Sequence, residues 1–586
     1  MPDAPTPIDP QPIEQFQKWT ELMGRGQQMM LEFMSKEQTS LPAADPLGIM
    51  ATWGRAMNAA MTDPAKLFDL QSRYLKDAMT LWQSFLSPGS ATSPVAGVKD
   101  KRFAGEAWRE TPAFDFLRQS YLLAASYVME GSRDLEGLDD HEKAKAQFLI
   151  KQYVDAISPS NFALTNPEVM KKTVETGGSN LLKGLEFLLD DLKSGRMRMT
   201  DENAFEVGRN VAITPGKVVW ENRLFQLIQY APATPKVHAV PLLIFPPWIN
   251  KFYILDLTAE KSFIRWAVEQ GLTVFVTSWK NADETLADAT MDTYVGEGLL
   301  TALERVLEIC GTKSTHTIGY CVAGTNLAAA LAVLAARGEA EKIASATFFT
   351  AQVDMSECGE LAIFIDEPGL EAVERITADK PVLDGRIMAS TFNMLRSNDL
   401  IWNYVVNNYL MGKDYFPFDL LYWNSDATNV PAKWHRQYLE DIYRDNKLAQ
   451  PGGLSVLGVP IDLTTVHTPA YIQGGKEDHI APARSAYKLT SHFKGDTRFV
   501  LAGSGHIAGV VNPPSANKYQ FWTSDKLPAT FDDFVQTATE TKGSWWPDWI
   551  KWLTPRSGSQ VKARIPGEGP FAAIEDAPGR YVKERI

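Results

Sequence analysis

The stretch of sequence that decides the fold is His316-Thr-Ile-Gly-Tyr-Cys-Val-Ala-Gly-Thr325, in which an apolar strand pattern runs into a tight turn. An Ala- and Leu-rich segment follows the turn and predicts a helix. This order of strand, turn and helix is typical of a nucleophile elbow, which normally has the pattern G-x-S-x-G. Because Cys321 stands where the elbow has its serine, we predict that Cys321 is a nucleophile. The alternative is a buried core cysteine, which is a common place for this residue.

Small residues surround Cys321, as the close packing of strand and helix at such a turn requires. Gly319 fits the first glycine position, Ala323 occupies the second, and Gly324 follows one residue later. Alanine is the next smallest residue, so we expect it to be tolerated there. The start of the helix also favours a thiolate at Cys321, because the first N–H groups of a helix carry partial positive charge.

The acid of a catalytic triad is expected in the loop Gly475-Lys-Glu-Asp-His479, which follows a strand predicted over residues 470–474. Asp478 is the candidate. Glu477 and His479 flank it, and neighbouring loop residues usually point in different directions, so the assignment stays open by one position.

The histidine is expected in the glycine-rich loop Gly503-Ser-Gly-His-Ile-Ala-Gly509, after a strand predicted over residues 498–502. His506 is therefore the candidate base. In the α/β-hydrolase fold the nucleophile comes first, then the acid, then the histidine, with the last two on loops after late strands. Cys321, Asp478 and His506 follow this order, which predicts an α/β-hydrolase core with these three residues as its triad.

An oxyanion hole completes such a site, because the charge on a tetrahedral intermediate needs N–H donors. One donor is expected from the backbone of Val322, directly after the nucleophile. The second is expected from the loop after the third strand, Phe245-Pro-Pro-Trp-Ile-Asn-Lys251. We assign it to Asn250, with Ile249 as the alternative that the sequence leaves open.

The whole chain divides into two predicted domains. Apolar residues at spacings of three and four predict helices over most of residues 13–85 and 114–192, so residues 1–200 are expected to form an α-helical N-terminal domain. In residues 201–586, a β-hairpin is followed by short strands that alternate with helices, which predicts a mostly parallel sheet. The strands are predicted at 240–245, 273–277, 316–319, 346–350, 470–474 and 498–502.

An aromatic-rich insertion separates the strands predicted at 346–350 and 470–474. It is too long for a loop, so a cap subdomain over the sheet is expected at residues 352–440. A cap would exclude water from the site, which acyl transfer to an acceptor other than water requires.

Composition narrows the classes of function. The formal net charge of −13 argues against nucleic acid as a partner, because phosphate binding requires clustered Lys and Arg. Three cysteines in 586 residues do not suggest a disulfide framework and fit a reducing compartment. No signal-peptide pattern is visible, and no apolar run approaches the about 18 residues that span a bilayer. We expect a cytoplasmic protein with no membrane span, no metal site and no cofactor.

Several stretches resemble class I polyhydroxyalkanoate synthases. The resemblance covers roughly residues 100–585 and is carried by Gly319-Tyr-Cys-Val-Ala-Gly324, Pro246-Pro-Trp-Ile-Asn-Lys-Phe-Tyr-Ile-Leu-Asp-Leu257, Asn398-Asp-Leu-Ile-Trp402, Tyr422-Trp-Asn-Ser-Asp-Ala-Thr428, Gly503-Ser-Gly-His-Ile-Ala-Gly-Val-Val-Asn-Pro513 and Pro578-Gly-Arg-Tyr-Val-Lys583. Ala323 departs from the family, which usually has glycine there. The departure concerns the geometry of the elbow and leaves the nucleophile in place.

The resemblance implies an acyltransferase that polymerises (R)-3-hydroxyacyl groups from coenzyme A thioesters and releases coenzyme A, with 3-hydroxybutyryl-CoA as the expected donor. By position, it makes Cys321 the acyl-carrying nucleophile, His506 the general base and Asp478 its partner. It also implies a polyester product held in granules, granule-coating proteins as further partners, a homodimer and a mobile cap. Trp423 is similar to a tryptophan that the family links to dimer contacts.

Two other functions stay open. A thioesterase or polyester hydrolase would use the same triad and pass the acyl group to water. A non-catalytic granule-binding scaffold would have no reason to keep Cys321, Asp478 and His506 together, so the intact set argues against it. Product analysis would separate the polymerising acyltransferase, which makes polymer, from the hydrolase, which makes free hydroxy acid.

A stripe of large apolar residues marks the N-terminal helical region: Met50, Trp53, Met57, Met61, Phe68, Leu75, Met79 and Trp82. It is either a core face packed against neighbouring helices or a surface for the polymer or for granule-coating proteins. Met-rich faces adapt to irregular apolar partners, which is the reason for the second interpretation.

Overall fold

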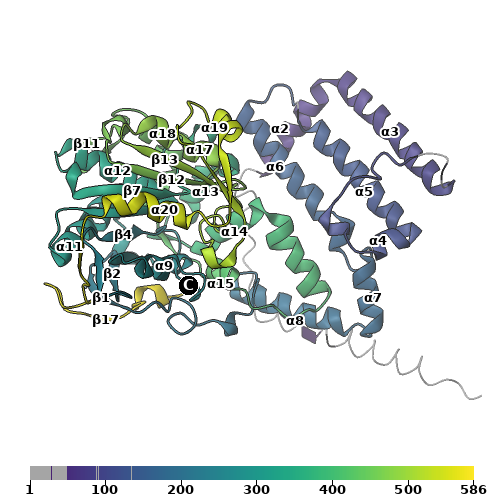
Figure 1. Ribbon diagram of the computed structural model, residues 1–586. Helices are drawn as coiled ribbons and strands as arrows, with labels where there is room; N and C mark the ends of the chain where they lie inside the picture. Colours follow the sequence, from purple (N-terminus) through teal and green to yellow (C-terminus); the bar gives the residue numbers. More distant parts are fainter. Residues whose placement is uncertain (1–24, 26–27, 30–48, 88, 90–91, 134) are drawn as a thin grey trace, which may run out of the picture. The chain divides into compact units, whose positions relative to one another are not determined.

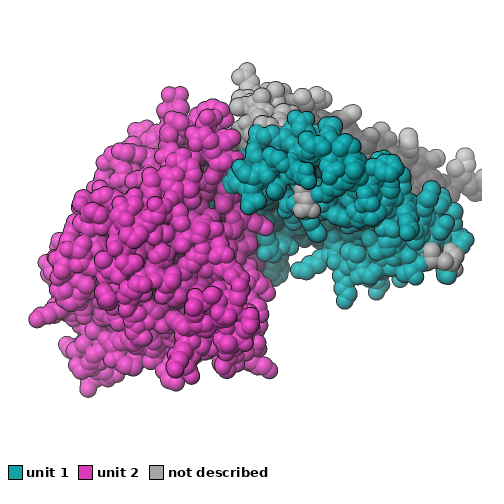
Figure 2. All heavy atoms as spheres, turned by 90° about the horizontal axis from the view of Figure 1, so that it is seen from above, with its two compact units in different colours: residues 1–199, 390–416 teal, residues 200–389, 417–586 magenta. Residues whose placement is uncertain are grey.

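The computed structural model describes residues 25, 28–29, 49–87, 89, 92–133 and 135–586. The helices predicted between residues 13 and 48 therefore lie almost wholly outside the described residues. The chain divides into two compact units, which Figure 2 colours separately. The first consists of Met1–Met199 and Ser390–Phe416, and the second of Thr200–Ala389 and Pro417–Ile586. Residues 390–416 fall inside the predicted cap, but they cluster with the N-terminal helices.

The first unit is helical throughout its described residues. Its helices, all labelled in Figure 1, are α2 (Ile49–Thr62), α3 (Pro64–Leu86), α4 (Ala107–Glu110), α5 (Pro112–Gly131), α6 (Asp140–Ala156), α7 (Pro167–Glu175) and α8 (Ser179–Ser194). Asp63 caps α3 by accepting the Lys66 N–H, and Asp139 and Glu142 form a capping box at the start of α6. Among the described residues, no helix is long and apolar enough to cross a membrane.

The late segment 390–416 completes this helical unit. Asn180 Nδ2 on α8 donates to the Leu410 carbonyl at 2.7 Å, and the Tyr409 hydroxyl donates to Asp191 Oδ2 at 2.6 Å. Gly184 permits this approach, because a Cβ there would lie 1.7 Å from the Tyr409 carbonyl oxygen. Helix α8 and the late segment therefore share one packed interface.

The second unit is built on an 11-stranded sheet in the order β15-β14-β13-β12-β7-β6-β4-β5-β2-β1-β17. The strands are β1 (Gly216–Glu221), β2 (Phe225–Tyr230), β4 (Leu242–Phe245), β5 (Val274–Trp279), β6 (Thr315–Tyr320), β7 (Ile343–Phe349), β12 (Ala470–Gly475), β13 (Thr497–Ala502), β14 (Gln520–Thr523), β15 (Thr539–Lys542) and β17 (Glu575–Asp576). The central strands from β13 to β5 pair in parallel, and the flanking strands pair antiparallel. This confirms the predicted α/β-hydrolase core and its opening hairpin, β1 with β2.

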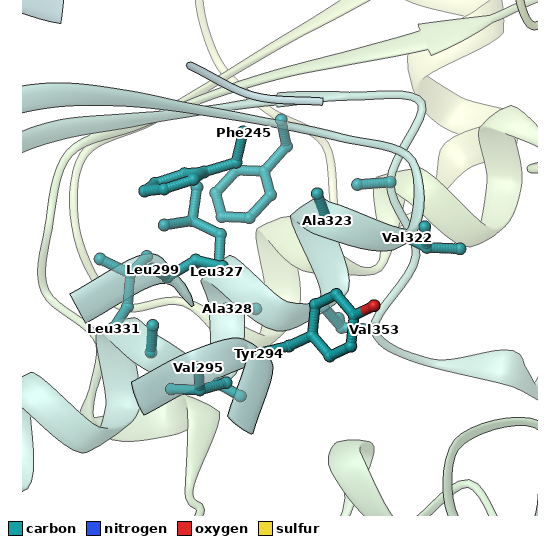
Figure 3. Packing of buried hydrophobic residues seen from close by; sticks show 14 of the residues in the cluster. Phe245, Tyr294, Val295, Leu299, Val322, Ala323, Leu327, Ala328, Leu331 and Val353 are labelled. Atoms are coloured by element: carbon teal, nitrogen blue, oxygen red, sulfur yellow. The ribbon is translucent and has the colours of Figure 1, made fainter. Parts of the chain in front are cut away.

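Side chains alternate across the sheet into two cores. On β4, Leu243 and Phe245 belong to one core, whereas Leu242 and Ile244 belong to the other. Helices α11 (Thr301–Cys310) and α12 (Val322–Ala336) cover the first core, and α9 (Phe263–Glu269) and α20 (Trp546–Leu553) cover the second. Figure 3 shows part of the first core, with Phe245 of β4 and Leu327 of α12. A parallel sheet covered on both faces needs strands that are apolar on both sides, as β4 is.

The carboxyl ends of the parallel strands meet at one edge of the sheet. Phe245 pairs in register with Gly319, Gly319 with Phe348, and Gly475 with Ala502. The loops after β4, β6, β12 and β13 therefore open at the same edge, which is where open α/β sheets bind their ligands.

The insertion between β7 and β12 carries α13 (Glu367–Thr377), α14 (Gly385–Leu395), α15 (Asp419–Ser425) and α16 (Ala432–Gln437), with π-helical segments at Asn398–Trp402, Val405–Leu410 and Tyr438–Arg444. Its last part packs on the first core through Trp434, Tyr438 and Ile442. This part belongs to the same unit as the sheet.

The turn at Cys321 depends on a close approach between β6 and α12. A Cβ on Gly319 would lie 2.6 Å from Gly324 Cα, and a Cβ on Gly324 would lie 2.4 Å from Ala351 Cβ. Ala323 is fully buried at the second glycine position of the motif. The position without space for a side chain is thus Gly324, one residue later than the usual pattern, and this explains how alanine is accommodated at 323.

We predict that Gly324→Ala lowers the free energy of unfolding by about 1–3 kcal/mol, the usual cost of overpacking a core, although alanine favours a helix by about 1 kcal/mol. Urea unfolding at fixed pH measures the change. Gly569→Ala is the matched control, because a Cβ there meets Ile309 only at ordinary contact distances of 3.5 Å and more. Equal stability of the two variants would contradict a closely packed elbow.

Candidate active site

Cys321 stands between the last residue of β6 and the first residue of α12. Its φ of 52° and ψ of −125° lie in a region that residues other than glycine rarely adopt, so the backbone is strained there. The Cys321 N–H donates to the Phe349 carbonyl at 2.9 Å, and the Gly324 N–H donates to the Cys321 carbonyl at 2.9 Å. These bonds hold the strained turn, and the thiol is half-buried.

Asp478 and His506 form a hydrogen-bonded pair. Asp478 Oδ2 lies 2.7 Å from His506 Nδ1, and Asp478 Oδ1 accepts the N–H groups of Ile480 at 2.9 Å and Ala481 at 2.8 Å. Asp478 is buried, whereas Glu477 is exposed. The carboxylate beside the histidine is therefore that of Asp478, and it leaves Nε2 of the ring as the nitrogen available to another partner.

Aromatic side chains fix the loop that carries His506. Tyr320, directly before the nucleophile position, donates its hydroxyl to the His506 carbonyl at 3.1 Å. The Trp545 indole N–H donates to the Gly509 carbonyl at 2.7 Å, and the Trp546 indole N–H donates to the Val510 carbonyl at 2.9 Å. Sequence reasoning missed these residues, because a bond to a loop carbonyl leaves no motif or spacing in the sequence.

The charge around His506 favours its protonated form. Burial lowers the pKa of the ring. The negative charges of Asp478 and Cys321, with hydrogen bonds to both, raise this pKa by more than burial lowers it, so that the pKa of His506 is raised to about 10. Cys321, Asp478 and His506 are therefore close enough to interact. The ring keeps its proton at neutral pH while both neighbours are negative, and loss of either charge lowers the pKa of the ring.

The other cysteines and a strand histidine are core groups. Burial raises the pKa of Cys310 to about 12 and that of Cys358 to about 11, so both stay protonated at neutral pH. Burial lowers the pKa of His316 to about 3, and its ring nitrogens contact the hydroxyls of Ser345 at 2.8 Å and Ser557 at 3.1 Å.

The loop after β4 opens at the same edge as the elbow. Val322 is the first residue of α12, where a backbone N–H has no acceptor within the helix. The Asn250 N–H donates to the Pro247 carbonyl at 3.4 Å, so the donor predicted at Asn250 already has an acceptor. This long bond does not decide between Asn250 and Ile249, so the second donor stays a prediction.

Trp423 is buried inside the second unit. Its side chain is 5% exposed, and its indole N–H donates to the Lys251 carbonyl at 2.7 Å. Because Lys251 ends the loop after β4, Trp423 fixes that loop. The tryptophan that the resemblance links to dimer contacts thus has a partner within its own chain.

The end of the insertion lies close to the elbow. Burial raises the pKa of both Tyr438 and Tyr443, and the charge of Cys321 adds to the effect on each. The Tyr438 hydroxyl lies 3.3 Å from Thr325 Oγ1 on α12. A thiol beside an imidazole, at a helix N-terminus and under an aromatic cover, is an arrangement that can transfer an acyl group through a covalent intermediate.

Family comparisons agree with this fold. A family described as poly-beta-hydroxybutyrate polymerase (PhaC) N-terminus matches residues 99–267, and the alpha/beta hydrolase fold matches residues 248–513. The chain is 45% identical over 551 residues to the poly(3-hydroxyalkanoate) polymerase subunit PhaC of Rhizobium meliloti, covering 92% of this chain and 90% of the relative. It is 47% identical over 542 residues to the poly(3-hydroxyalkanoate) polymerase of Methylorubrum extorquens, covering 91% and 89%. It is 44% identical over 590 residues to the subunit PhaC of Cupriavidus necator, covering 99% and 96%.

We predict that Asp478→Asn lowers the pKa of His506 from about 10 by at least one unit, because it removes the largest of the influences that raise it. Nitrogen NMR of labelled imidazoles measures the change, and His506→Gln identifies the signal. His316 serves as the internal control: with its pKa lowered to about 3, it stays neutral between pH 5 and 9 in both proteins. An unchanged His506 titration would mean that the carboxylate does not act on the ring.

Proposed function

Because the chain belongs to the poly(3-hydroxyalkanoate) polymerase family, we propose that it polymerises (R)-3-hydroxyacyl groups from coenzyme A thioesters through a thioester on Cys321, with 3-hydroxybutyryl-CoA as donor. The observation that carries this chemistry is the interaction of His506 with both Asp478 and Cys321 beside a strained elbow. A cysteine suits the task, because its thiolate is both a good nucleophile and a good leaving group.

In the first half-reaction, the Cys321 thiolate attacks the carbonyl carbon of the donor thioester. A C–S bond to Cys321 forms, the bond to the coenzyme A sulfur breaks, and the leaving thiolate takes the proton that His506 holds. The N–H groups of Val322 and of the loop after β4 stabilise the oxyanion. One thioester replaces another, so the step changes the free energy little.

In the second half-reaction, neutral His506 takes the proton of a 3-hydroxyl group, and the oxygen attacks the carbonyl carbon of the Cys321 thioester. An ester C–O bond forms, the C–S bond breaks, and Cys321 leaves as a thiolate beside the protonated ring. Acylation removes the charge of Cys321, one of the influences that raise the pKa of His506. The ring therefore becomes a base at the stage when the hydroxyl must be deprotonated.

Water is the competing acceptor. Trp434 and Tyr438, from the end of the insertion, are 0% and 4% exposed where they pack on the core beside α12. Such a cover favours a hydroxyl that arrives with its own apolar chain over water, and so favours polymerisation over a thioesterase reaction.

Contact with the polymer is proposed for the first unit. Met57, Met61, Phe68, Leu75, Met79 and Trp82 are 50–72% exposed on α2 and α3, although Trp53 packs on Tyr153. This leaves most of the described stripe on the surface, where it suits a polyester granule or a protein that coats one. We also propose that the enzyme associates with polyester granules in the cytoplasm and that it forms a homodimer.

Cys321→Ala should abolish release of coenzyme A from 3-hydroxybutyryl-CoA and formation of polymer, because no other thiol is activated. Cys310→Ala and Cys358→Ala are the matched controls and should keep activity within about twofold, since burial keeps both thiols protonated. Release of coenzyme A is followed with a thiol reagent and polymer by light scattering. Normal turnover by Cys321→Ala would end the proposal, and free hydroxy acid without polymer from the wild-type enzyme would favour the thioesterase.

Replacing Phe68 and Met79 together by serine should leave coenzyme A release unchanged and lower the fraction of enzyme that sediments with polymer granules at least threefold. Both side chains are mostly exposed, 72% and 68%, so the fold should keep its stability. Lys76→Ser and Gln83→Ser on the same helix form the control, because they change polar positions of α3. Undiminished sedimentation of the apolar variant would remove the stripe from the proposal.

A further inference from the structure

Three buried N–H donors near the elbow have no acceptor within the part of the chain that the structure describes. They are Asn326 Nδ2, Gln352 Nε2 and Trp434 Nε1, and their side chains belong to residues that are 0%, 5% and 0% exposed. Native proteins pair most of their buried polar atoms, so three unpaired donors in one neighbourhood need an explanation.

Trp248 connects two of the donors. Its indole N–H donates to Asn326 Oδ1 at 3.1 Å, which uses the oxygen of that amide and turns the NH₂ group elsewhere. Its ring packs on the Trp434 ring, with 5.3 Å between the centroids. Asn326 lies five residues beyond Cys321 on α12, about 7.5 Å along the helix axis.

Gln352 joins the same neighbourhood from the other side. The Thr325 hydroxyl donates to the Gln352 carbonyl at 2.7 Å and lies 3.3 Å from the Tyr438 hydroxyl. The Tyr438 ring packs on the Trp434 ring at 5.4 Å between centroids, and the charge of Cys321 reaches Tyr438. Asn326 and Trp434 are thus linked through Trp248, and Gln352 is linked to the same part of α12 through its backbone carbonyl.

The chemistry of this set selects its ligand. All three atoms donate, so a ligand that satisfies them must bring acceptor oxygen. An ester carbonyl brings acceptor oxygen alone. The aromatic rings around the donors suit the apolar carbons between one carbonyl and the next, as in most ligand sites, where few polar groups stand in an apolar lining.

We propose that Asn326, Gln352 and Trp434 form a subsite that binds ester carbonyls of the growing polyester next to Cys321. The proposal rests on the proposed function and adds where the product chain is held. A chain seated there stays with the enzyme between additions, while its terminal thioester carbonyl occupies the oxyanion hole.

The test uses Gln352→Met and Trp434→Phe, which remove the N–H donors and leave an apolar side chain, of similar length for methionine and smaller for phenylalanine. The control is Trp549→Phe, because Trp549 is equally buried and its N–H is paired with Thr347 Oγ1 at 3.1 Å. The full-length enzyme is given 3-hydroxybutyryl-CoA. The first turnover of coenzyme A release, the length of the polymer by size-exclusion chromatography, and the melting temperature are measured.

Both subsite variants should make polymer at least fivefold shorter, and this loss should exceed any loss in the rate at which the first coenzyme A is released. Gln352→Met should keep or raise the melting temperature of the free enzyme, because it removes a buried donor that has no partner. Trp549→Phe should do the reverse, with a lower melting temperature and polymer of normal length.

Polymer of normal length from both subsite variants would overturn the subsite. So would a lower melting temperature with equal loss of first turnover and polymer length, since that result assigns the donors a structural role. Failure of the proposed function is distinguishable from failure of the subsite. The first would appear as wild-type enzyme that makes no polymer, or as an active Cys321→Ala variant, and neither result involves the subsite variants.

Discussion

The close approach of β6 and α12 is the constraint on which the candidate site depends. Neither Gly319 nor Gly324 has room for a Cβ, so the helix starts directly after Cys321, and Cys321 itself takes a positive φ. This one contact places a thiol at a helix N-terminus, leaves the first N–H groups of the helix without helical acceptors and directs the turn to the edge where the other loops open. A wider spacing would let the turn relax, and each of these properties would be lost together.

The acidic and basic partners show how charge organises the site around that turn. The N–H groups of Ile480 and Ala481 donate to Asp478 Oδ1, so the position of this carboxylate does not depend on His506 alone. In the proposed reaction, the carboxylate beside the ring stays fixed, whereas the sulfur of Cys321 gains and loses charge. A permanent and a variable negative charge beside one imidazole would let a single base give up a proton at one stage of the proposed reaction and take one at another.

The elbow, the pairing of Asp478 with His506 and the order of the strands were predictable from the sequence, because each depends on local pattern: small residues at a turn, apolar runs, and glycine-rich loops after strands. It left the acid open by one position, since only the bonds of Asp478 distinguish it from Glu477. Its choice of Asn250 over Ile249 as the second oxyanion donor stays a prediction. It also treated residues 352–440 as one cap, whereas 390–416 cluster with the first unit, because periodicity shows that a face is apolar and not which partner covers it.

That division of the insertion has a consequence for how the chain matures on the ribosome. Helix α8 leaves the ribosome early. Its partners Tyr409, which packs on Gly184, and Leu410, which bonds to Asn180, follow only after the strands between Gly216 and Phe349 have been made. The helical unit therefore lacks the segment that packs on α8 while about half of the sheet is synthesised. Domains usually fold one after another as they emerge. Here the order of synthesis interleaves the two units, so the nascent helices have an uncovered face until residues 390–416 have been made.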